Sequence, residues 1–156
     1  GWVALMTGAR DSRVACAAGI GAGNIGVLAE DMAGDAKIRA NWEDTFEKLT
    51  RGNPARGVGG KKTVEEILAN SLEFDIRRQG DALSRKPVLL IGGWRDDTAP
   101  LEKIMIPIAR SIEAVDGSRL TPVVVDDDHV FRDTREAVLA AVRNWLQEEC
   151  RPLLQP

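Results

Sequence analysis

Two polar residues that could carry proton-transfer chemistry each follow a short apolar run. Residues 88–91 lead into Gly93 and Asp96, and residues 123–125 lead into His129, the only histidine of the chain. A short apolar run closed by turn-forming residues is typical of a buried strand, and open parallel sheets carry their sites beyond the carboxyl ends of their strands. A carboxylate and an imidazole in such loops are candidates for an orienting acid and a general base.

The segment around Asp96 resembles the acid-bearing strand and loop of α/β-hydrolases. Residues 86–100 read KPVLLIGGWRDDTAP. In that family an apolar strand runs into a glycine, two variable residues, an aspartate and, four positions later, a proline; Gly93, Asp96 and Pro100 occupy these places. The resemblance implies that Asp96 is the acid of a catalytic triad. Asp97 is the alternative, because a turn or helix-capping role would suit either carboxylate.

The segment around His129 resembles the last strand and histidine loop of the same family. Residues 121–131 read TPVVVDDDHVF, and the family typically has a strand, an acidic or small pair, a histidine, and an apolar or aromatic residue. The resemblance implies that His129 is the triad base, which takes a proton from the nucleophile and later delivers it to the leaving group. A loop histidine without a partner is the alternative. Asp126, Asp127 and Asp128 are expected to form a solvated turn.

A triad also needs a nucleophile, and the strand-to-helix elbow G-x-S-x-G does not occur in the chain. Residues 1–19, GWVALMTGARDSRVACAAG, resemble the family's segment after the elbow: a glycine, a small apolar helix, an Asp-x-Arg turn and an apolar strand. The resemblance implies a carboxyl-terminal portion of an α/β-hydrolase domain that begins just after its nucleophile. The isolated chain is therefore expected to be inactive. None of the five serines fits an elbow: Ser12, Ser71, Ser84, Ser111 and Ser118.

Within the family, the order of strand, acid, helix, strand, histidine and terminal helix resembles prolyl-oligopeptidase-type peptidases and related acyl hydrolases. The segment Ser71-Leu-Glu-Phe-Asp75 adds to this likeness, which esterases share. The resemblance implies a serine hydrolase, either a peptidase or an esterase, that needs no cofactor and no metal. The implied partners are a small acyl ester or a peptide substrate, together with the missing amino-terminal part of the domain.

Apolar spacing and breakers predict an α/β fold, namely a partial α/β-hydrolase fold with a parallel sheet and flanking helices. Strands are expected at 13–20, 88–91 and 123–125, and helices at 2–9, 25–33, 36–49, 63–72 and 101–115. Thr63 and Glu66 have the spacing of a capping box, and Pro107 is expected to kink or restart its helix. Residues 51–60 are predicted as a loop, and residues 41–85 as a cap-like or connecting insertion in a single domain, 1–156.

The terminal helix is expected to cover one face of the sheet. Its predicted apolar face consists of Phe131, Val138, Leu139, Val142, Trp145 and Leu146.

Two further functions remain open. Residues 21–26, GAGNIG, match the dinucleotide-binding pattern G-x-G-x-x-G after an apolar run. A dinucleotide site would require a second strand about 20 residues later, and residues 37–46 are instead predicted to be helical. On the hydrolase interpretation the glycines turn the chain out of the strand. The other alternative is a non-catalytic α/β interaction domain that keeps the hydrolase frame.

Composition excludes several classes of partner. The chain has 156 residues, enough for one domain that buries about 70% of its unfolded surface. With 21 basic and 24 acidic residues, a net charge of −3 and no basic run, a nucleic-acid site is not expected. The apolar runs are far shorter than the roughly 20 residues that span a bilayer. No signal peptide precedes Gly1, which leaves the compartment open, with the cytoplasm favoured.

The two cysteines have no spacing that suggests a metal site or a disulfide framework. Cys16 is expected to be a small buried thiol and Cys150 to be incidental.

Overall fold

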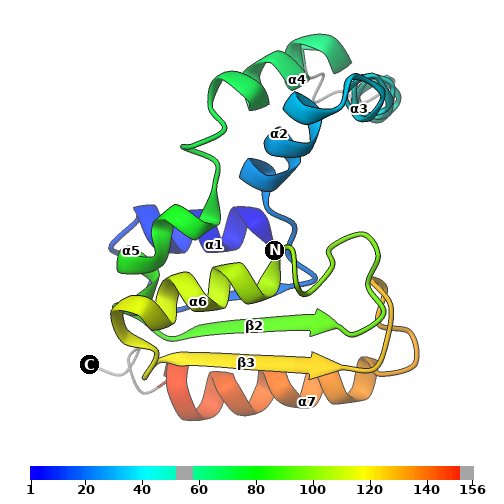
Figure 1. Ribbon diagram of the computed structural model, residues 1–156. Helices are drawn as coiled ribbons and strands as arrows, with labels where there is room; N and C mark the ends of the chain where they lie inside the picture. The colour runs from blue at the N-terminus through cyan, green and yellow to red at the C-terminus, as the bar shows by residue number, and fades with distance from the viewer. Residues whose placement is uncertain (52–57, 152–156) are drawn as a thin grey trace. The chain divides into compact units, whose positions relative to one another are not determined.

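The computed structural model describes residues 1–51 and 58–151, and its centre is a three-stranded parallel sheet. The strands β1 (Ala17–Ile20), β2 (Val88–Gly93) and β3 (Leu120–Val125) lie in the order β1-β2-β3. Ala17 is in register with Val88, and Val88 with Leu120. All three carboxyl ends therefore meet at one edge (Figure 1). The sheet and its flanking helices confirm the predicted α/β class.

Helices cover both faces of this sheet. The helices α1 (Trp2–Arg10) and α6 (Met105–Asp116) lie on one face, and α7 (Arg135–Trp145) lies on the other (Figure 1). A π-helical turn, η2 (Leu146–Cys150), extends α7, while η1 (Ile76–Gln79) and α5 (Gly80–Ser84) precede β2. Leu89 and Ile91 pack against the α7 side, so the alternation along β2 directs Val88 and Leu90 to the opposite face.

The helix between β2 and β3 begins later than predicted. Residues 101–104 form turns, and α6 starts at Met105, so Pro107 lies in its first turn, where a missing backbone N–H breaks no helical hydrogen bond. The helix packs through Ile108, Ala109 and Ile112, which are buried.

The terminal helix differs from its predicted apolar face. Phe131 precedes α7 in the loop after β3, although it shares a core with Val138 and Trp145. Leu139 and Leu146 are 62% and 44% exposed, so the prediction that they face the sheet is wrong. The buried stripe of this helix is narrower than the apolar spacing suggests.

The connection from α1 to β1 is organised by Lys86. Its ammonium donates hydrogen bonds to the carbonyl oxygens of Gly8, Asp11 and Val14. A cation at this place satisfies free carbonyls at the carboxyl end of α1. The chain turns between Asp11 and Val14, so β1 begins at Ala17 rather than at residue 13 as predicted.

Cys16 and Cys150 are joined in a disulfide, with their Cα atoms 5.8 Å apart. The expectation of a free buried thiol and an incidental second cysteine is therefore wrong. The sequence could not show this pairing because the two cysteines are 134 positions apart in the chain. They meet only because α7 runs back along the sheet and its π-helical extension ends beside the start of β1.

The chain divides into two compact units, one formed by residues 1–23 with the chain from Ile76 onward, the other by Asn24–Asp75. The second unit contains α2 (Ile25–Gly34), α3 (Ala36–Thr50) and α4 (Gly60–Ala69). These helices surround a core of Ala29, Met32, Val64 and Ile67. Residues 52–57, in the predicted loop 51–60, lie outside the described residues. The insertion predicted over 41–85 overlaps this unit.

The ends of the helical unit are tied to each other. The Asn24 side-chain amide donates a hydrogen bond of 2.7 Å to Asp75, and both side chains are buried. The side-chain oxygen Oδ1 of Asn24 accepts a hydrogen bond from the backbone N–H of Gly26, which caps α2. A Cβ on Gly26 would come within 2.7 Å of the Asp75 backbone, so glycine is required for this close approach.

The predicted capping box of Thr63 and Glu66 is wrong, because α4 begins earlier, at Gly60. The hydroxyl of Thr63 donates to the carbonyl of Gly59 inside the helix. The backbone N–H of Gly60 is satisfied by the carboxylate of Glu47 on the neighbouring helix α3. A contact between two helices has replaced the local cap.

Candidate active site

The structure brings Asp96 and His129 together. The Nδ1 atom of His129 lies 2.8 Å from Oδ2 of Asp96. Asp96 follows β2 and His129 follows β3, and these strands are parallel neighbours. Their loops therefore leave the sheet at the same edge, as the sequence predicts. The pairing joins an acid and a potential base across two adjacent loops.

The carboxylate of Asp96 is held by its own loop. Its side chain is fully buried, and Oδ1 accepts hydrogen bonds of 2.9 and 2.8 Å from the backbone N–H groups of Thr98 and Ala99. These bonds leave Oδ2 directed at the imidazole. Asp97, the alternative acid, is exposed, and the carboxylate paired with His129 is that of Asp96.

The ring of His129 is partly open. Its side chain is 39% exposed. Nδ1 is engaged by Asp96, whereas Nε2 has no hydrogen-bond partner among the described residues. An Nδ1–H donated to a carboxylate fixes the tautomer in which Nε2 carries a lone pair. The ring can therefore accept a proton at Nε2.

The two loops are also joined by their backbones. The N–H of Trp94 donates to the carbonyl of Val125, and the N–H of Arg95 donates to the carbonyl of Asp127 at 2.9 Å. The guanidinium of Arg95 bonds the Asp126 carboxylate and carbonyl, both at 2.9 Å. A Cβ on Gly93 would lie 2.5 Å from the Asp127 carbonyl oxygen, which gives a physical reason for glycine at the end of β2.

Asp127 is not part of a solvated turn, contrary to the prediction. It is 3% exposed, whereas Asp126 and Asp128 are exposed as expected. Burial alone would raise the pKa of Asp127, but hydrogen bonds from Asp128, Thr134 and Asp133 outweigh burial and lower this pKa below its usual value. Sequence reasoning missed this residue because three adjacent aspartates look alike until the donors are known.

Serine side chains of the sheet-bearing unit are hydrogen-bonded within their own segments or lie at the amino ends of the strands. Ser84 donates to Asp81 and Ser111 donates to Ile108, each within its own helical segment. Ser12 lines a cavity at the amino ends of the strands. Of the serines in the described part of the chain, none is hydrogen-bonded to His129.

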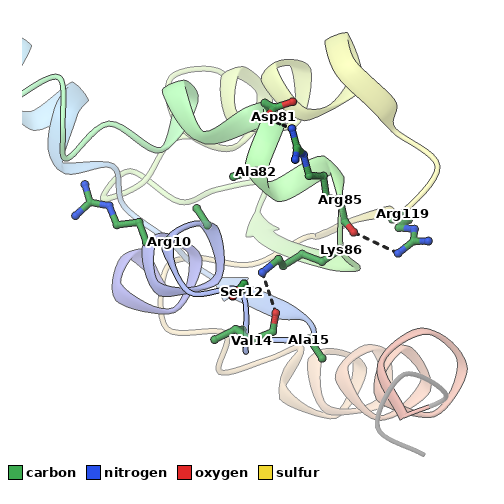
Figure 2. A pocket seen from close by; sticks show the side chains of 10 residues that line it. Arg10, Ser12, Val14, Ala15, Asp81, Ala82, Arg85, Lys86 and Arg119 are labelled. Atoms are coloured by element: carbon green, nitrogen blue, oxygen red, sulfur yellow. Dashed lines mark hydrogen bonds and ion pairs between the residues drawn. The ribbon is translucent and has the colours of Figure 1, made fainter. Parts of the chain in front are cut away.

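A cavity of about 540 Å³ lies at the opposite edge of the sheet (Figure 2). Its basic residues are Arg10, Lys86, Arg85 and Arg119. Lys86 donates to the carbonyl of Val14, Arg85 pairs with Asp81, and Arg119 donates to the carbonyl of Arg85 (Figure 2). These side chains stabilise the connections that enter the strands.

The glycine-rich segment 21–26 forms the turn after β1, and its last two residues begin α2. Gly21 has φ +50°, in the left-handed region that favours glycine. The residues that would form the second strand of a dinucleotide site are helical, in α3, as predicted. The neighbour of β1 in the sheet is β2.

Metal-ligating clusters and membrane-spanning helices are both missing from the described ranges, 1–51 and 58–151. No group of three or more histidine, cysteine, aspartate or glutamate residues there could hold a metal ion. No helix there is long and apolar enough to cross a bilayer.

No protein-family model and no curated protein matches the chain. Among solved structures, the chain is similar to an esterase from Pyrococcus furiosus, with a TM-score of 0.60 and 15% sequence identity. The likeness covers 96% of this chain and 50% of that esterase chain, so the chain spans half the length of the structure it resembles. At this identity the likeness supports the fold.

Proposed function

We propose that this chain supplies the acid, Asp96, and the base, His129, of a Ser-His-Asp triad in a serine hydrolase with an α/β-hydrolase fold. The serine lies on polypeptide outside the chain. The observation that carries the proposal is the 2.8 Å contact between a fully buried carboxylate and a half-open imidazole at the carboxyl edge of a parallel sheet.

In the proposed mechanism Nε2 of His129 takes the hydroxyl proton as the serine oxygen attacks the substrate carbonyl. Asp96 accepts the Nδ1–H hydrogen bond throughout and stabilises the imidazolium without taking its proton. The imidazolium then protonates the leaving alcohol or amine, which leaves an acyl-serine. A water molecule attacks the acyl-serine, His129 accepts its proton, and the carboxylic acid departs as the serine is reprotonated.

The proposed substrate is a small acyl ester, with short peptides as the second class. The similar Pyrococcus furiosus protein is described as an esterase, which supports the ester as the first substrate to test. Hydrolysis of an ester and hydrolysis of a peptide both form an acyl-serine intermediate. The same pair of Asp96 and His129 would therefore serve both substrate classes.

The proposed partner of the chain is the amino-terminal part of the hydrolase domain. Two observations support it: the structural likeness covers half of the esterase chain, and β1 is an edge strand of the described sheet, paired with β2 alone. An edge strand presents free backbone donors and acceptors to another strand. We propose that the strand bearing the nucleophile pairs with β1 in parallel.

The test uses two proteins: the isolated 156-residue chain and the product of the full reading frame that encodes it. Both are assayed on p-nitrophenyl acetate and butyrate and on a short peptide anilide, and both are treated with a fluorophosphonate probe. We expect the longer protein to hydrolyse the esters and to be labelled on a serine outside this chain. The isolated chain is expected to do neither.

Two results would overturn the proposal. One is labelling of a serine among the 156 residues. The other is a full-length product that lacks a G-x-S-x-G elbow and shows no hydrolysis of either substrate class. A non-catalytic α/β domain would then be the better description.

A further inference from the structure

The loop that carries His129 is closed at its base by one buried side chain. Oδ2 of Asp127 accepts hydrogen bonds of 2.9 Å from the backbone N–H groups of Asp133 and Thr134 and from the Thr134 hydroxyl. Oδ1 accepts a bond of 2.8 Å from the N–H of Asp128. One carboxylate thus links the end of β3 to the start of α7, and His129 lies on the chain between them.

We propose that Asp127 is a positioning residue that holds His129 against Asp96, an inference that rests on the proposed function for its catalytic meaning. Its carboxylate fixes both ends of the loop. Because the loop is already fixed, the ring of His129 lies against Asp96 before the reaction begins.

A second anchor lies on the other side of the histidine. Phe131 has φ 53°, a conformation that a bulky residue rarely adopts, and its side chain is buried in the core with Leu89 and Ile91. The N–H of Phe131 bonds the carbonyl of Asp128. His129 is therefore held between a buried aromatic ring and the closed base of the loop.

Asp127 does not compete with Asp96 for the imidazole. Both of its oxygens are occupied by donors of its own loop, and the carboxylate paired with His129 is that of Asp96. The donors from Asp133 and Thr134 also belong to the start of α7, where a negative charge is favourable. The role of Asp127 is to place the base, and the role of Asp96 is to orient its ring.

The experiment reads the state of the single histidine by NMR. The full 156-residue chain is labelled with ¹⁵N-histidine, and long-range ¹H–¹⁵N spectra identify which ring nitrogen carries the proton. The wild-type protein is expected to show a protonated Nδ1 and a free Nε2 in its neutral ring. In Asp127→Asn we expect the neutral ring to shift to a mixture dominated by the Nε2–H tautomer, as in unrestrained histidine.

The matched control is Asp133→Asn. It removes one negative charge from the same loop but keeps the backbone N–H of residue 133, which donates a hydrogen bond to Asp127. It is expected to keep the wild-type ring spectrum. If Asp127→Asn fails to fold, Thr134→Val removes a single donor from the carboxylate, and Thr134→Ser restores the hydroxyl. The Val variant is expected to shift the tautomer part of the way and the Ser variant to restore it.

A merely structural role would lower the melting temperature and leave the tautomer of the folded protein unchanged. A wild-type ring spectrum in folded Asp127→Asn would therefore overturn the inference. In the full-length hydrolase, Asp127→Asn is expected to lower kcat about 10²-fold with little change in KM, as for a displaced catalytic group. If the full-length protein hydrolyses nothing, the proposed function fails while the NMR result still decides the role of Asp127.

Discussion

The backbone of Gly21 lies against the ring of His129, the base of the proposed triad. A Cβ atom at Gly21 would come within 3.4 Å of Cε1 of His129 and 3.2 Å of the ring of Phe131. Gly21 also holds a left-handed conformation, φ +50°, and its N–H donates to the carbonyl of Ile91. The turn after β1 thus contributes one side of the histidine's surroundings.

Gly21→Ala is expected to lower the free energy of unfolding by about 1–2 kcal/mol, because an alanine there must adopt left-handed angles. The ring of Phe131, 3.2 Å from that Cβ position, must also move by a few tenths of an ångström, while the ring of His129 would be in van der Waals contact with the new methyl group. The full-length hydrolase is therefore expected to lose activity. Gly23→Ala is the control, since nothing lies within 4 Å of its Cβ position. Urea unfolding of both variants measures the difference, and equal losses would contradict the prediction.

The pair itself predicts the largest effects on catalysis. In the full-length protein, His129→Ala and Asp96→Asn are each expected to lower kcat for ester hydrolysis by about 10³- to 10⁴-fold, because the base or its fixed tautomer is lost. Asp97→Asn, at the exposed neighbouring carboxylate, is expected to leave kcat within about twofold, the ordinary effect of a surface change. Full activity in His129→Ala would remove this histidine from the mechanism.

The carboxylate of Asp127 is expected to make the free energy of unfolding depend on pH. Its pKa in the folded protein is lowered by hydrogen bonds that outweigh burial, so its stabilising effect is complete above the unfolded-state value of about 3.9 and is lost as the pH falls through the folded-state pKa. The difference in unfolding free energy between wild type and Asp127→Asn should therefore shrink below about pH 4. Urea titrations from about pH 3 to 7 measure it. A difference that stays constant over this whole range would contradict the assignment.

The disulfide between Cys16 and Cys150 predicts a response to reductant. It closes a loop across a sequence separation of 134 residues, and breaking it is expected to lower the free energy of unfolding by about 2–4 kcal/mol. Urea unfolding with and without a phosphine reductant measures the change. The double variant with both cysteines replaced by serine should not respond to the reductant. Two titratable thiols in the native, air-oxidised protein would show that the bond does not form.

The positions of Asp96 and His129 were predictable because each depends on local sequence. Each follows an apolar strand at a short distance, and parallel neighbours bring their carboxyl ends to one edge. Gly93 was predictable as part of the same pattern, and the close approach of the Asp127 carbonyl supplies its physical cause.

The features that the sequence did not reveal depend on contacts between distant segments. The disulfide partner of Cys16 is brought close only by the path of the terminal helix. The first N–H of α4, at Gly60, is capped by Glu47 of another helix. The local sequence pattern therefore predicted the wrong first residue for this helix. Asp127 could not be told from its neighbours because its donors include residues six and seven positions later.

The hydrogen bond between Asn24 and Asp75 also bears on how such a chain can evolve. These residues begin and end the helical unit, and their buried hydrogen bond holds the two ends of that unit beside each other. The distance between the two ends of the unit therefore does not depend on how many residues lie between them. We therefore expect that helices between these two residues could be lengthened, shortened or exchanged in evolution without altering the register of β2 and β3 that brings Asp96 to His129.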